Sequence, residues 1–293
     1  MFKRGTSPSR GGSQSPSSAS PTGVPAAHLE ARDVLIEYPR PGSSEVTTAV
    51  SECDLTLDRG DFVCIVGPSG CGKTTLLNAV AGFVGISGGS LELDGRGIPG
   101  PGPDRAMVFQ QANLLPWRTV TANVTYGVEL SGRAKKAEAR ARAQDLLELV
   151  GLKDAGQSYP AQLSGGMQAR VNLARALAVE PEILLLDEPF ASIDAQTRET
   201  MLVELLRVCA AADVTALFVT HDISEAAFLA DRVCVFSPRP GRIIKEVAVP
   251  WQRPRSHELR RTPEFAAVCQ DISDALYGAI ADAASPELEG AHR

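Results

Sequence analysis

The stretch Gly67-Pro68-Ser69-Gly70-Cys71-Gly72-Lys73-Thr74 decides the fold of this chain. It fits the pattern G-x-x-x-x-G-K-[ST] at every fixed position, and Thr75 follows it directly. The apolar run 62–66 before it is typical of a buried strand, and residues 76–81 after it are typical of a helix. A strand, a glycine-rich loop and a helix in this order predict a phosphate-binding loop.

This loop contains the chemical groups that a nucleotide phosphate requires. Its glycines let successive backbone N–H groups point at an anion, and the helix start adds its positive dipole end. Lys73 is expected to bridge the outer phosphates, and the Thr74 hydroxyl to ligate Mg²⁺. A turn that merely connects a strand to a helix would not require the lysine and the hydroxyl in register. The sequence therefore predicts a nucleotide site.

Composition limits the other classes of function. The chain has 293 residues, of which 44% are hydrophobic, so it can bury one substantial core in one or two domains. Its net charge of −6 provides no basic footprint, and we expect no nucleic-acid partner. No apolar run approaches the roughly 18 residues of a membrane span, and residues 1–27 do not resemble a signal peptide. We therefore expect a cytosolic protein.

The pattern along the chain predicts an α/β core with a helical insert. Residues 1–27 are rich in serine, proline and glycine, which is typical of a disordered tail. Strands are predicted at 29–38, 46–57, 90–93, 106–109, 183–186 and 214–219, and helices at 135–150, 195–211 and 263–283. Strands that alternate with helices in the second half indicate parallel βαβ units with right-handed crossovers.

Two adjacent carboxylates, Asp187 and Glu188, end the fully apolar strand pattern at 183–186. We expect Asp187 to hold Mg²⁺ and Glu188 to polarise the water that attacks the γ-phosphate. The alternative is an ordinary Asp-Glu-Pro helix start. Because a phosphate-binding loop is also present in the chain, the catalytic interpretation is favoured.

Polar or aromatic residues at three other strand ends are candidate ligands. His221 follows the strand pattern at 214–219 and should emerge at the same carboxyl edge of the sheet, where we expect it to contact the γ-phosphate. Gln110 follows another strand and is a candidate for Mg²⁺ or the attacking water, although glutamine is common at strand ends. Tyr38 would either stack on adenine or anchor the edge of a strand.

The stretch Leu163-Ser164-Gly165-Gly166-Met167-Gln168 is a second candidate phosphate site. Ser164 is predicted to cap a helix that starts there and continues to about Ala178. Such a start presents backbone donors to an anion. The alternative is a simple capped helix start, which the spacing to the other motifs disfavours.

The six cysteines do not form a C-x-x-C pair, so neither a zinc site nor a disulfide framework is predicted. Most are expected to be small core residues. Cys71 lies inside the phosphate loop near a helix N-terminus, where a thiolate would be favoured. The other interpretation of Cys71 is a tolerated filler at a variable loop position.

Together these motifs resemble the ATP-binding subunit of an ABC transporter, from about residue 29 to residue 283. The resemblance implies a P-loop NTPase (RecA-like) α/β core with an antiparallel β subdomain and an inserted α-helical subdomain at about 119–178. The ATPase domain would span residues 28–250, and residues 251–293 would form a C-terminal helical extension.

In that family two such subunits close head-to-tail, so that the 163–168 stretch of one covers ATP held by the other. The resemblance therefore implies ATP and Mg²⁺ as cofactors and a second ATP-binding subunit as partner. The implied nucleotide contacts are Tyr38 for adenine, Gly67, Pro68, Ser69, Gly70, Cys71, Gly72, Lys73, Thr74 and Thr75 for the phosphates, and Ser164, Gly165, Gly166 and Asp194 across the interface. The implied catalytic residues are Lys73, Gln110, Glu188 and His221, and the implied metal ligands are Thr74, Gln110 and Asp187.

Within the family, segments 96–102, 108–110, 114–118 and 237–242 look like those of importers of taurine, other sulfonates and nitrate, with taurine importers the nearest likeness. Two departures lie near the expected dimer seam. Ala169 stands where relatives often have a polar residue, and Ser192-Ile193 replaces the usual alanine and leucine before Asp194.

We therefore expect a transport-coupled ATPase, a translocase subunit that powers import of taurine or a related sulfonate. It would lie peripherally on the cytoplasmic face of the cell membrane, with transmembrane permease subunits as partners and a solute-binding protein as an indirect one. Residues 111–118 would lie beside the groove for the permease. The alternatives are a nitrate or other small-anion importer, a soluble ABC ATPase acting on DNA or ribosomes, and a P-loop kinase.

Overall fold

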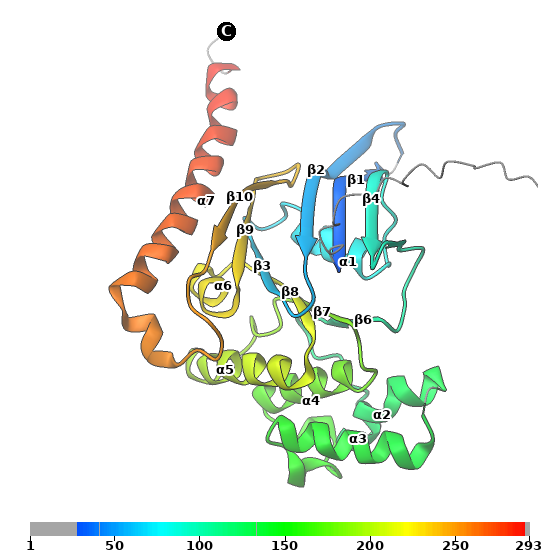
Figure 1. Ribbon diagram of the computed structural model, residues 1–293. Helices are drawn as coiled ribbons and strands as arrows, with labels where there is room; N and C mark the ends of the chain where they lie inside the picture. The colour runs from blue at the N-terminus through cyan, green and yellow to red at the C-terminus, as the bar shows by residue number, and fades with distance from the viewer. Residues whose placement is uncertain (1–27, 41, 133, 291–293) are drawn as a thin grey trace, which may run out of the picture.

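The structure is a computed structural model that describes residues 28–40, 42–132 and 134–290, with side chains described as far as residue 283. The tail predicted at 1–27 lies outside these residues. The described chain contains two sheets, seen side by side in Figure 1. The smaller sheet is antiparallel, in the order β2-β1-β4-β5, and consists of β1 (Leu29–Pro39), β2 (Val46–Leu57), β4 (Gly88–Leu93) and β5 (Arg96–Gly97).

The larger sheet is parallel except at one edge, where β10 runs antiparallel to β9. Its order is β10-β9-β3-β8-β7-β6, and its strands are β3 (Phe62–Val66), β6 (Arg105–Val108), β7 (Ile183–Asp187), β8 (Thr215–Thr220), β9 (Arg232–Phe236) and β10 (Ile243–Ala248). Because both faces of its central strands are covered, β3 and β8 are buried along their whole length.

Alternation along the central strands divides the interior into two cores. In β3, Phe62, Cys64 and Val66 face one core, and Val63 and Ile65 face the other. The first core is closed by helices, and the second by the antiparallel sheet and by α1 (Lys73–Val80). The strand that precedes the phosphate loop is therefore packed on both sides.

The remaining helices lie mainly on one side of the larger sheet. They are α2 (Val120–Ser131), α3 (Lys136–Leu149), α4 (Gly165–Leu177), α5 (Ala195–Ala212), α6 (Ile223–Leu229) and α7 (Pro263–Gly290), with short 3-10 turns η1 (Lys153–Ala155), η2 (Pro160–Gln162) and η3 (His257–Arg261). The helices predicted at 135–150, 195–211 and 263–283 are confirmed as α3, α5 and α7. The strand predicted at 106–109 ends one residue earlier, at Val108.

Helices α2, α3 and α4 form a group below the larger sheet in Figure 1. The hydroxyl of Thr119 caps α2 by accepting from the Ala122 backbone N–H, and α2 ends before Gly132, whose φ of 64° is unfavourable for other residues. The buried amide of Asn123 satisfies the backbone of Leu115 at both N–H and C=O. This amide fixes the end of the 111–118 segment onto α2.

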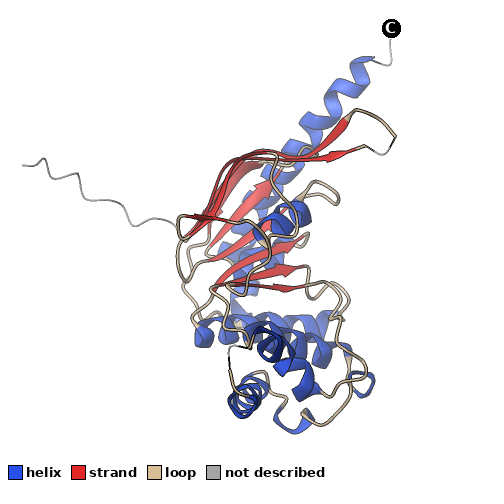
Figure 2. Cartoon of the chain, turned by 90° about the vertical axis from the view of Figure 1, so that its right-hand side faces the viewer, coloured by secondary structure: helices blue, strands red, loops and turns tan. Residues whose placement is uncertain are grey.

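Helix α7 is attached to the body over only part of its length. Phe265, Ile272 and Leu276 are buried against the core, whereas Tyr277 is 65% exposed. Figure 2 shows the end of the helix extending past the sheets. Within the described part of the chain, none of the helices combines the length and the apolar character that a membrane crossing requires.

Candidate nucleotide-binding and hydrolysis site

Four parallel strands bring the predicted catalytic residues to one edge of the larger sheet. Val66 pairs with Thr220, Val219 with Asp187, and Leu186 with Val108. The residues that leave the sheet at this edge are Gly67 after β3, His221 after β8, Glu188 after β7 and Gln110 after β6. Carboxyl ends of parallel strands are where ligands bind in open α/β sheets. The sheet register, and not proximity in sequence, assembles this site.

The loop 67–72 is held in a shape that only glycine allows at critical points. Gly72 has a φ of 112°, and a Cβ atom there would lie 2.5 Å from the carbonyl oxygen of Ala49 in β2. Gly72 also provides no side chain to cap α1, which begins at Lys73. The first turn of α1 therefore keeps the uncapped backbone donors and the positive dipole end that favour a phosphate group.

Lys73 places a buried positive charge at this loop. Its side chain is part of a residue only 5% exposed, and Nζ donates to the carbonyl oxygens of Gly67 at 2.8 Å and Pro68 at 2.9 Å. Among the ion pairs of the described residues, none joins Lys73 to a carboxylate. The direct partners of the charge are therefore neutral carbonyl groups, while the carboxylate of Asp187 interacts with it from further away. A lysine without a direct ion pair suits the binding of an anion.

Thr74 and Asp187 form the oxygen-rich part of the edge. The Thr74 hydroxyl donates to Oδ1 of Asp187 at 3.0 Å. Burial raises the pKa of Asp187, and the neighbouring Glu188 raises it further, while the hydrogen bond from Thr74 and the charge of Lys73 lower it. A hydroxyl and a carboxylate in contact are hard oxygen donors of the kind that Mg²⁺ prefers. These two residues fit a magnesium ion, which would also offset the burial of the carboxylate.

Glu188 and His221 form a second pair at the same edge. Oε2 of Glu188 lies 3.0 Å from Nδ1 of His221, and the two side chains are 23% and 60% exposed. Glu188 has a φ of 44°, and its backbone N–H donates to the Val219 carbonyl of the adjacent strand. The left-handed conformation turns the chain out of β7 at this point. A non-glycine residue in this conformation at a strand end is typical of functional sites.

The predicted capped helix at Ser164 is confirmed. Ser164 is the N-cap of α4, and its Oγ accepts from the Met167 backbone N–H at 3.3 Å. Ser164 and Gly165 are exposed, whereas Gly166 is buried. A Cβ atom on Gly166 would lie 2.7 Å from Cγ2 of Thr197 in α5, so a larger residue would push α4 away from α5.

Asp194 is the corresponding cap of α5. Its carboxylate accepts from the Thr197 backbone N–H at 3.0 Å, and this hydrogen bond lowers the pKa of Asp194. Asp194 and Ser192 are exposed, but Ile193 is only 6% exposed and packs in the core of its own chain. Ile193 and the half-buried Ala169 line a cavity of about 200 Å³ beside Gln110. The side chain of Ile193 therefore contributes to packing within its own chain.

Gln110 and Tyr38 are both exposed, but at different places. Gln110 lies two residues beyond the end of β6. Tyr38 is 39% exposed near the end of β1, where it pairs with Thr47 of β2. Two residues further along, β2 reaches Ala49, which contacts the phosphate loop. The antiparallel sheet thus holds Tyr38 one strand away from that loop.

The interpretation of Cys71 as a favoured thiolate is wrong. Cys71 is 1% exposed, and burial raises the pKa of its thiol above the ordinary value despite the lowering effect of Lys73. Burial dominates because β2 and the loop after β9 cover the inner side of the phosphate loop. Cys71 behaves as the small buried residue of the other interpretation.

The 237–241 loop also shapes the site, although nothing in the sequence indicates this contribution. Arg239 Nε donates to the Gly70 carbonyl at 3.2 Å, and a Cβ on Gly67 would lie 2.8 Å from Cβ of Phe236. A Cβ on Gly241 would collide with the carbonyl oxygen of Cys71. Pro238, Pro240 and Gly241 follow the apolar strand β9, and a glycine at such a place indicates that another backbone segment approaches closely. The sequence does not indicate which segment this is.

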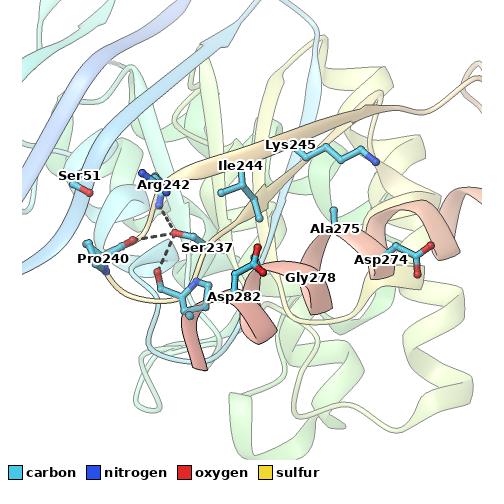
Figure 3. Close-up of a pocket in the computed structure, with 13 residues that line it drawn as sticks. Ser51, Ser237, Pro240, Arg242, Ile244, Lys245, Asp274, Ala275, Gly278 and Asp282 are labelled. Atoms are coloured by element: carbon cyan, nitrogen blue, oxygen red, sulfur yellow. Dashed lines mark hydrogen bonds between the residues drawn. The ribbon is translucent and has the colours of Figure 1, made fainter. Parts of the chain in front are cut away.

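A groove of about 690 Å³ lies on the other side of this loop, between β10 and α7 (Figure 3). Both of its basic residues form ion pairs, Lys245 with Asp271 at 2.6 Å and Arg242 with Glu52 at 3.7 Å. Ser237 Oγ accepts from the Arg242 backbone N–H and lies 3.0 Å from the carbonyl oxygen of Pro240, so it closes its own turn. The phosphate loop does not line this groove, and the groove is not part of the edge described above.

Comparison with known proteins identifies the family of this chain. The sequence profile of the ABC transporter family matches residues 50–191. The bicarbonate transport ATP-binding protein CmpD of Synechocystis is 41% identical over 271 residues, which are 90% of this chain and 95% of that protein. This chain belongs to the ABC transporter family.

Two further relatives have other named cargoes. The nitrate import ATP-binding protein NrtD of Synechococcus elongatus is 44% identical over 243 residues, covering 82% of this chain and 88% of that protein. The taurine import ATP-binding protein TauB of Escherichia coli is 44% identical over 234 residues, covering 78% of this chain and 91% of that protein. The ABC protein described here is thus an importer ATPase of the nitrate, bicarbonate and taurine branch.

Solved structures confirm the predicted fold class. A dimeric ATP-binding cassette in a post-hydrolysis state, bound to ADP and Pi, is 30% identical with a TM-score of 0.66, covering 76% of this ABC protein and 100% of that chain. A component of the ABC transporter complex cbiONQ of Clostridium perfringens is 25% identical with a TM-score of 0.67, covering 76% and 89%. The expected ATPase activity and the expected cofactors, ATP and Mg²⁺, follow from membership of this family.

Proposed function

We propose that this ABC ATPase powers the import of taurine or a related sulfonate through a separate membrane permease. The observation that carries the hydrolytic part is the pairing of Thr74 with Asp187 and of Glu188 with His221 at one sheet edge. The family resemblance of segments such as 237–242 motivates the sulfonate. An importer of nitrate or bicarbonate is the second candidate, because relatives that carry these names are 44% and 41% identical.

The residues at the sheet edge would each have a distinct role in ATP hydrolysis. Lys73 would bridge the outer phosphates, while Thr74 and Asp187 would hold Mg²⁺, with Gln110 as a further ligand. The metal, when bound, neutralises charge on the phosphate oxygens. Glu188 would accept a proton from the attacking water, and His221 would contact the γ-phosphate and stay in place through its 3.0 Å contact with Glu188.

The other nucleotide contacts would complete this site from two directions. Tyr38 would cover the adenine from the antiparallel sheet, and the backbone of 67–75 would surround the phosphates. Ser164, Gly165, Gly166 and Asp194 would reach ATP held by a second copy of the chain. Support for this is that the N-terminus of α4 and Asp194 are exposed on the surface, and that a similar cassette is dimeric.

We propose that residues 111–118 contact the permease on the cytoplasmic face of the membrane. Trp117 in this segment is 72% exposed, and nearby residues are tied to α4 because Arg175 donates to the carbonyl oxygens of Ala112 and Asn113, each at 2.9 Å. The exposed rings of Phe83 and Phe109 stack with their centroids 6.3 Å apart. Exposed aromatic side chains are enriched at protein interfaces.

We further propose the domain division 28–250 for the ATPase, with its helical subdomain at about 119–178, and 251–293 for the C-terminal extension. Support comes from the packing of α2, α3 and α4 against one another below the larger sheet and from the projection of α7.

The test is ATPase activity of the complex with its permease and solute-binding protein in lipid vesicles. Taurine, an alkanesulfonate, nitrate and bicarbonate are each added with the binding protein, and a Glu188→Gln complex serves as the inactive control. We expect stimulation by taurine or the alkanesulfonate. Stimulation by nitrate or bicarbonate alone would overturn the sulfonate assignment and support the second candidate. Failure to assemble with any permease would overturn the transport function.

A further inference from the structure

A charge pair between the partly exposed Arg198 and the buried Glu225 lies directly behind the proposed catalytic edge. Arg198 is on α5, in the first turn after Asp194, and Glu225 is on α6, shortly after His221. Nε of Arg198 lies 3.7 Å from Oε1 of Glu225, whose side chain is 7% exposed. The pair joins two helices, each of which begins just after a predicted site residue.

Arg198 connects this pair to the segment before α5. Its Nη2 donates to the carbonyl oxygen of Ile193 at 2.8 Å, so it holds the backbone that immediately precedes Asp194. In contrast to Nη2, its Nε is buried without a hydrogen-bond partner, because Glu225 at 3.7 Å is too far for one. A buried donor left unpaired is unfavourable and requires an explanation. A small movement of Ile193 and Arg198 toward α6 would satisfy it.

Glu225 connects the pair to the residues on both sides of His221. Its Oε2 accepts from the Thr220 hydroxyl at 2.9 Å, and the same hydroxyl accepts from the Asp222 backbone N–H at 3.0 Å. Asp222 in turn caps α6 through the backbone N–H groups of Ser224 and Glu225. The Thr220 hydroxyl therefore connects Glu225 to the backbone on both sides of His221.

The charge of Glu225 is costly where it lies. Burial raises its pKa, the charge of Asp222 raises it further, and Thr220, Arg198 and His221 lower it. Buried ion pairs contribute little net stability compared with apolar residues, and the best-attested reason for keeping them is to specify one arrangement. On the outer side, Arg260 contacts both Ser224 of α6 and Glu199 of α5, at 2.6 and 3.5 Å, and holds the two helices together. A shift at Ile193 would then reach Glu225 through the Arg198 side chain.

We propose that Arg198 and Glu225 are positioning residues that link the Ser192–Asp194 segment to His221. Closure of a second subunit on this segment moves Ile193, completes the contact of Arg198 with Glu225, and through Thr220 fixes His221 for hydrolysis. Neither residue touches the nucleotide. This inference rests on the proposed roles of Asp194 at the subunit interface and of His221 at the γ-phosphate.

The test compares Glu225→Gln, Arg198→Met, Arg198→Lys and the double variant Arg198→Met/Glu225→Gln. We expect each removal of charge to lower kcat about tenfold with KM for ATP within about twofold, which is the pattern of a contribution made only at the transition state. The double variant should be no slower than the worse single variant, because residues of one network are not additive. Arg198→Lys should recover part of the activity. Glu204→Gln, at an ion pair on the same helix, is the matched control and should keep the wild-type rate.

Three results would overturn the inference. The first is a normal kcat in both Glu225→Gln and Arg198→Met. The second is that, in both variants, KM for ATP rises as much as kcat falls or the protein no longer folds. The third is a double variant whose loss equals the product of the single losses. The His221→Ala variant distinguishes a failure of the proposed Arg198–Glu225 link from a failure of the proposed role of His221. If His221→Ala turns over ATP normally, the proposed role of His221 is wrong, whereas a slow His221→Ala beside a normal Glu225→Gln refutes only the link.

Discussion

The phosphate-loop edge and the start of α4 are both donor-rich helix termini, but they differ in what surrounds them. At the first, Lys73, Thr74 and Glu188 already contact other residues of the same chain, and the lysine is buried. At the second, the Ser164 hydroxyl accepts from the backbone of its own helix, and Gly165 is exposed. Among the described residues outside the helix backbone, no atom lies within 4 Å of a Cβ at Gly165. The phosphate-loop edge is assembled within one chain, whereas the start of α4 is left open to contact another molecule. Binding and hydrolysis should therefore respond differently to changes at the two places.

The largest effect is expected from Glu188→Gln. Removing the proposed base should lower ATP turnover by about 10²–10⁴-fold, the usual contribution of general base catalysis. ATP binding should stay within about threefold, since the amide keeps the size of the side chain and Lys73 is untouched. Turnover is measured by phosphate release and binding by a fluorescent nucleotide. Glu138→Gln, at a surface position on α3, is the control. A variant that still hydrolyses ATP at the wild-type rate would exclude Glu188 as the base.

Gly165→Asp addresses the second region without disturbing the first. An acidic residue in the first turn should stabilise α4 slightly through the helix dipole, and a Cβ there meets no other atom. The same carboxylate would repel phosphate bound by the opposite subunit, so we expect turnover to fall about a hundredfold, comparable to loss of a preorganised donor.

In this variant the affinity of the single subunit for ATP should be unchanged, and ATP should no longer promote dimers in size-exclusion chromatography. A variant that hydrolyses ATP normally would show that the start of α4 is a capped helix and no more. A variant that loses ATP binding as a monomer would place the start of α4 in its own chain's site, and the contrast between the two regions would disappear.

Gly241→Ala should distort the phosphate loop and so weaken ATP binding, because residue 241 packs against the inner side of this loop. A Cβ at residue 241 would collide with the Cys71 carbonyl oxygen and press on Phe236, so the phosphate loop must shift. We expect ATP affinity to fall about tenfold, equivalent to about 1.4 kcal/mol. The matched control is Gly85→Ala, where a Cβ meets nothing within 4 Å. Equal affinity in the two variants, determined by calorimetry, would mean that the 237–241 loop does not support the phosphate loop.

The smallest effect is expected from Asp187→Asn in the absence of nucleotide and metal. Because burial raises the folded-state pKa of Asp187 above its ordinary 3.8, the folded protein binds the proton more tightly than the unfolded chain. The contribution of Asp187 to stability is therefore most favourable at low pH and declines as pH rises through the folded pKa.

At pH 7 the amide should then raise the melting temperature slightly, with the gain diminishing toward pH 4. With Mg²⁺ and ATP added, the wild type should gain more stability than the variant. Both are measured by differential scanning calorimetry. A variant that melts lower than the wild type at pH 7 without ligand would show that the Thr74 contact outweighs the burial of the carboxylate.

Much of this site could be predicted because its signals are local. The glycines before Lys73, the acids after the apolar strand 183–186, and Ser164 before a helical pattern each reveal their structure within a few residues. The parallel order of the strands then places these ends together. None of these signals depends on a contact between residues far apart in the chain.

The rest depends on contacts between segments far apart in the chain. Nothing near Gly241 indicates that it meets Cys71, and nothing near Arg198 indicates that Glu225 lies opposite. The sequence alone leaves both interpretations of Cys71 open for the same reason, because the neighbours that bury its thiol come from β2 and from the loop after β9. The burial and the pairing of charged groups depend on tertiary contacts, which cannot be inferred from the local pattern of a single sequence.

The division of β3 between two cores has a practical consequence for anyone who alters this protein. Val63 and Ile65 belong to the core shared with the antiparallel sheet, and Phe62, Cys64 and Val66 to the core shared with the helices. Neighbouring substitutions along five residues would therefore loosen opposite halves of the molecule, and each would reach the phosphate loop at the end of the strand. Strand β3 is thus shared by both cores. Substitutions at its odd-numbered positions would change the packing of one core, and substitutions at its even-numbered positions the packing of the other.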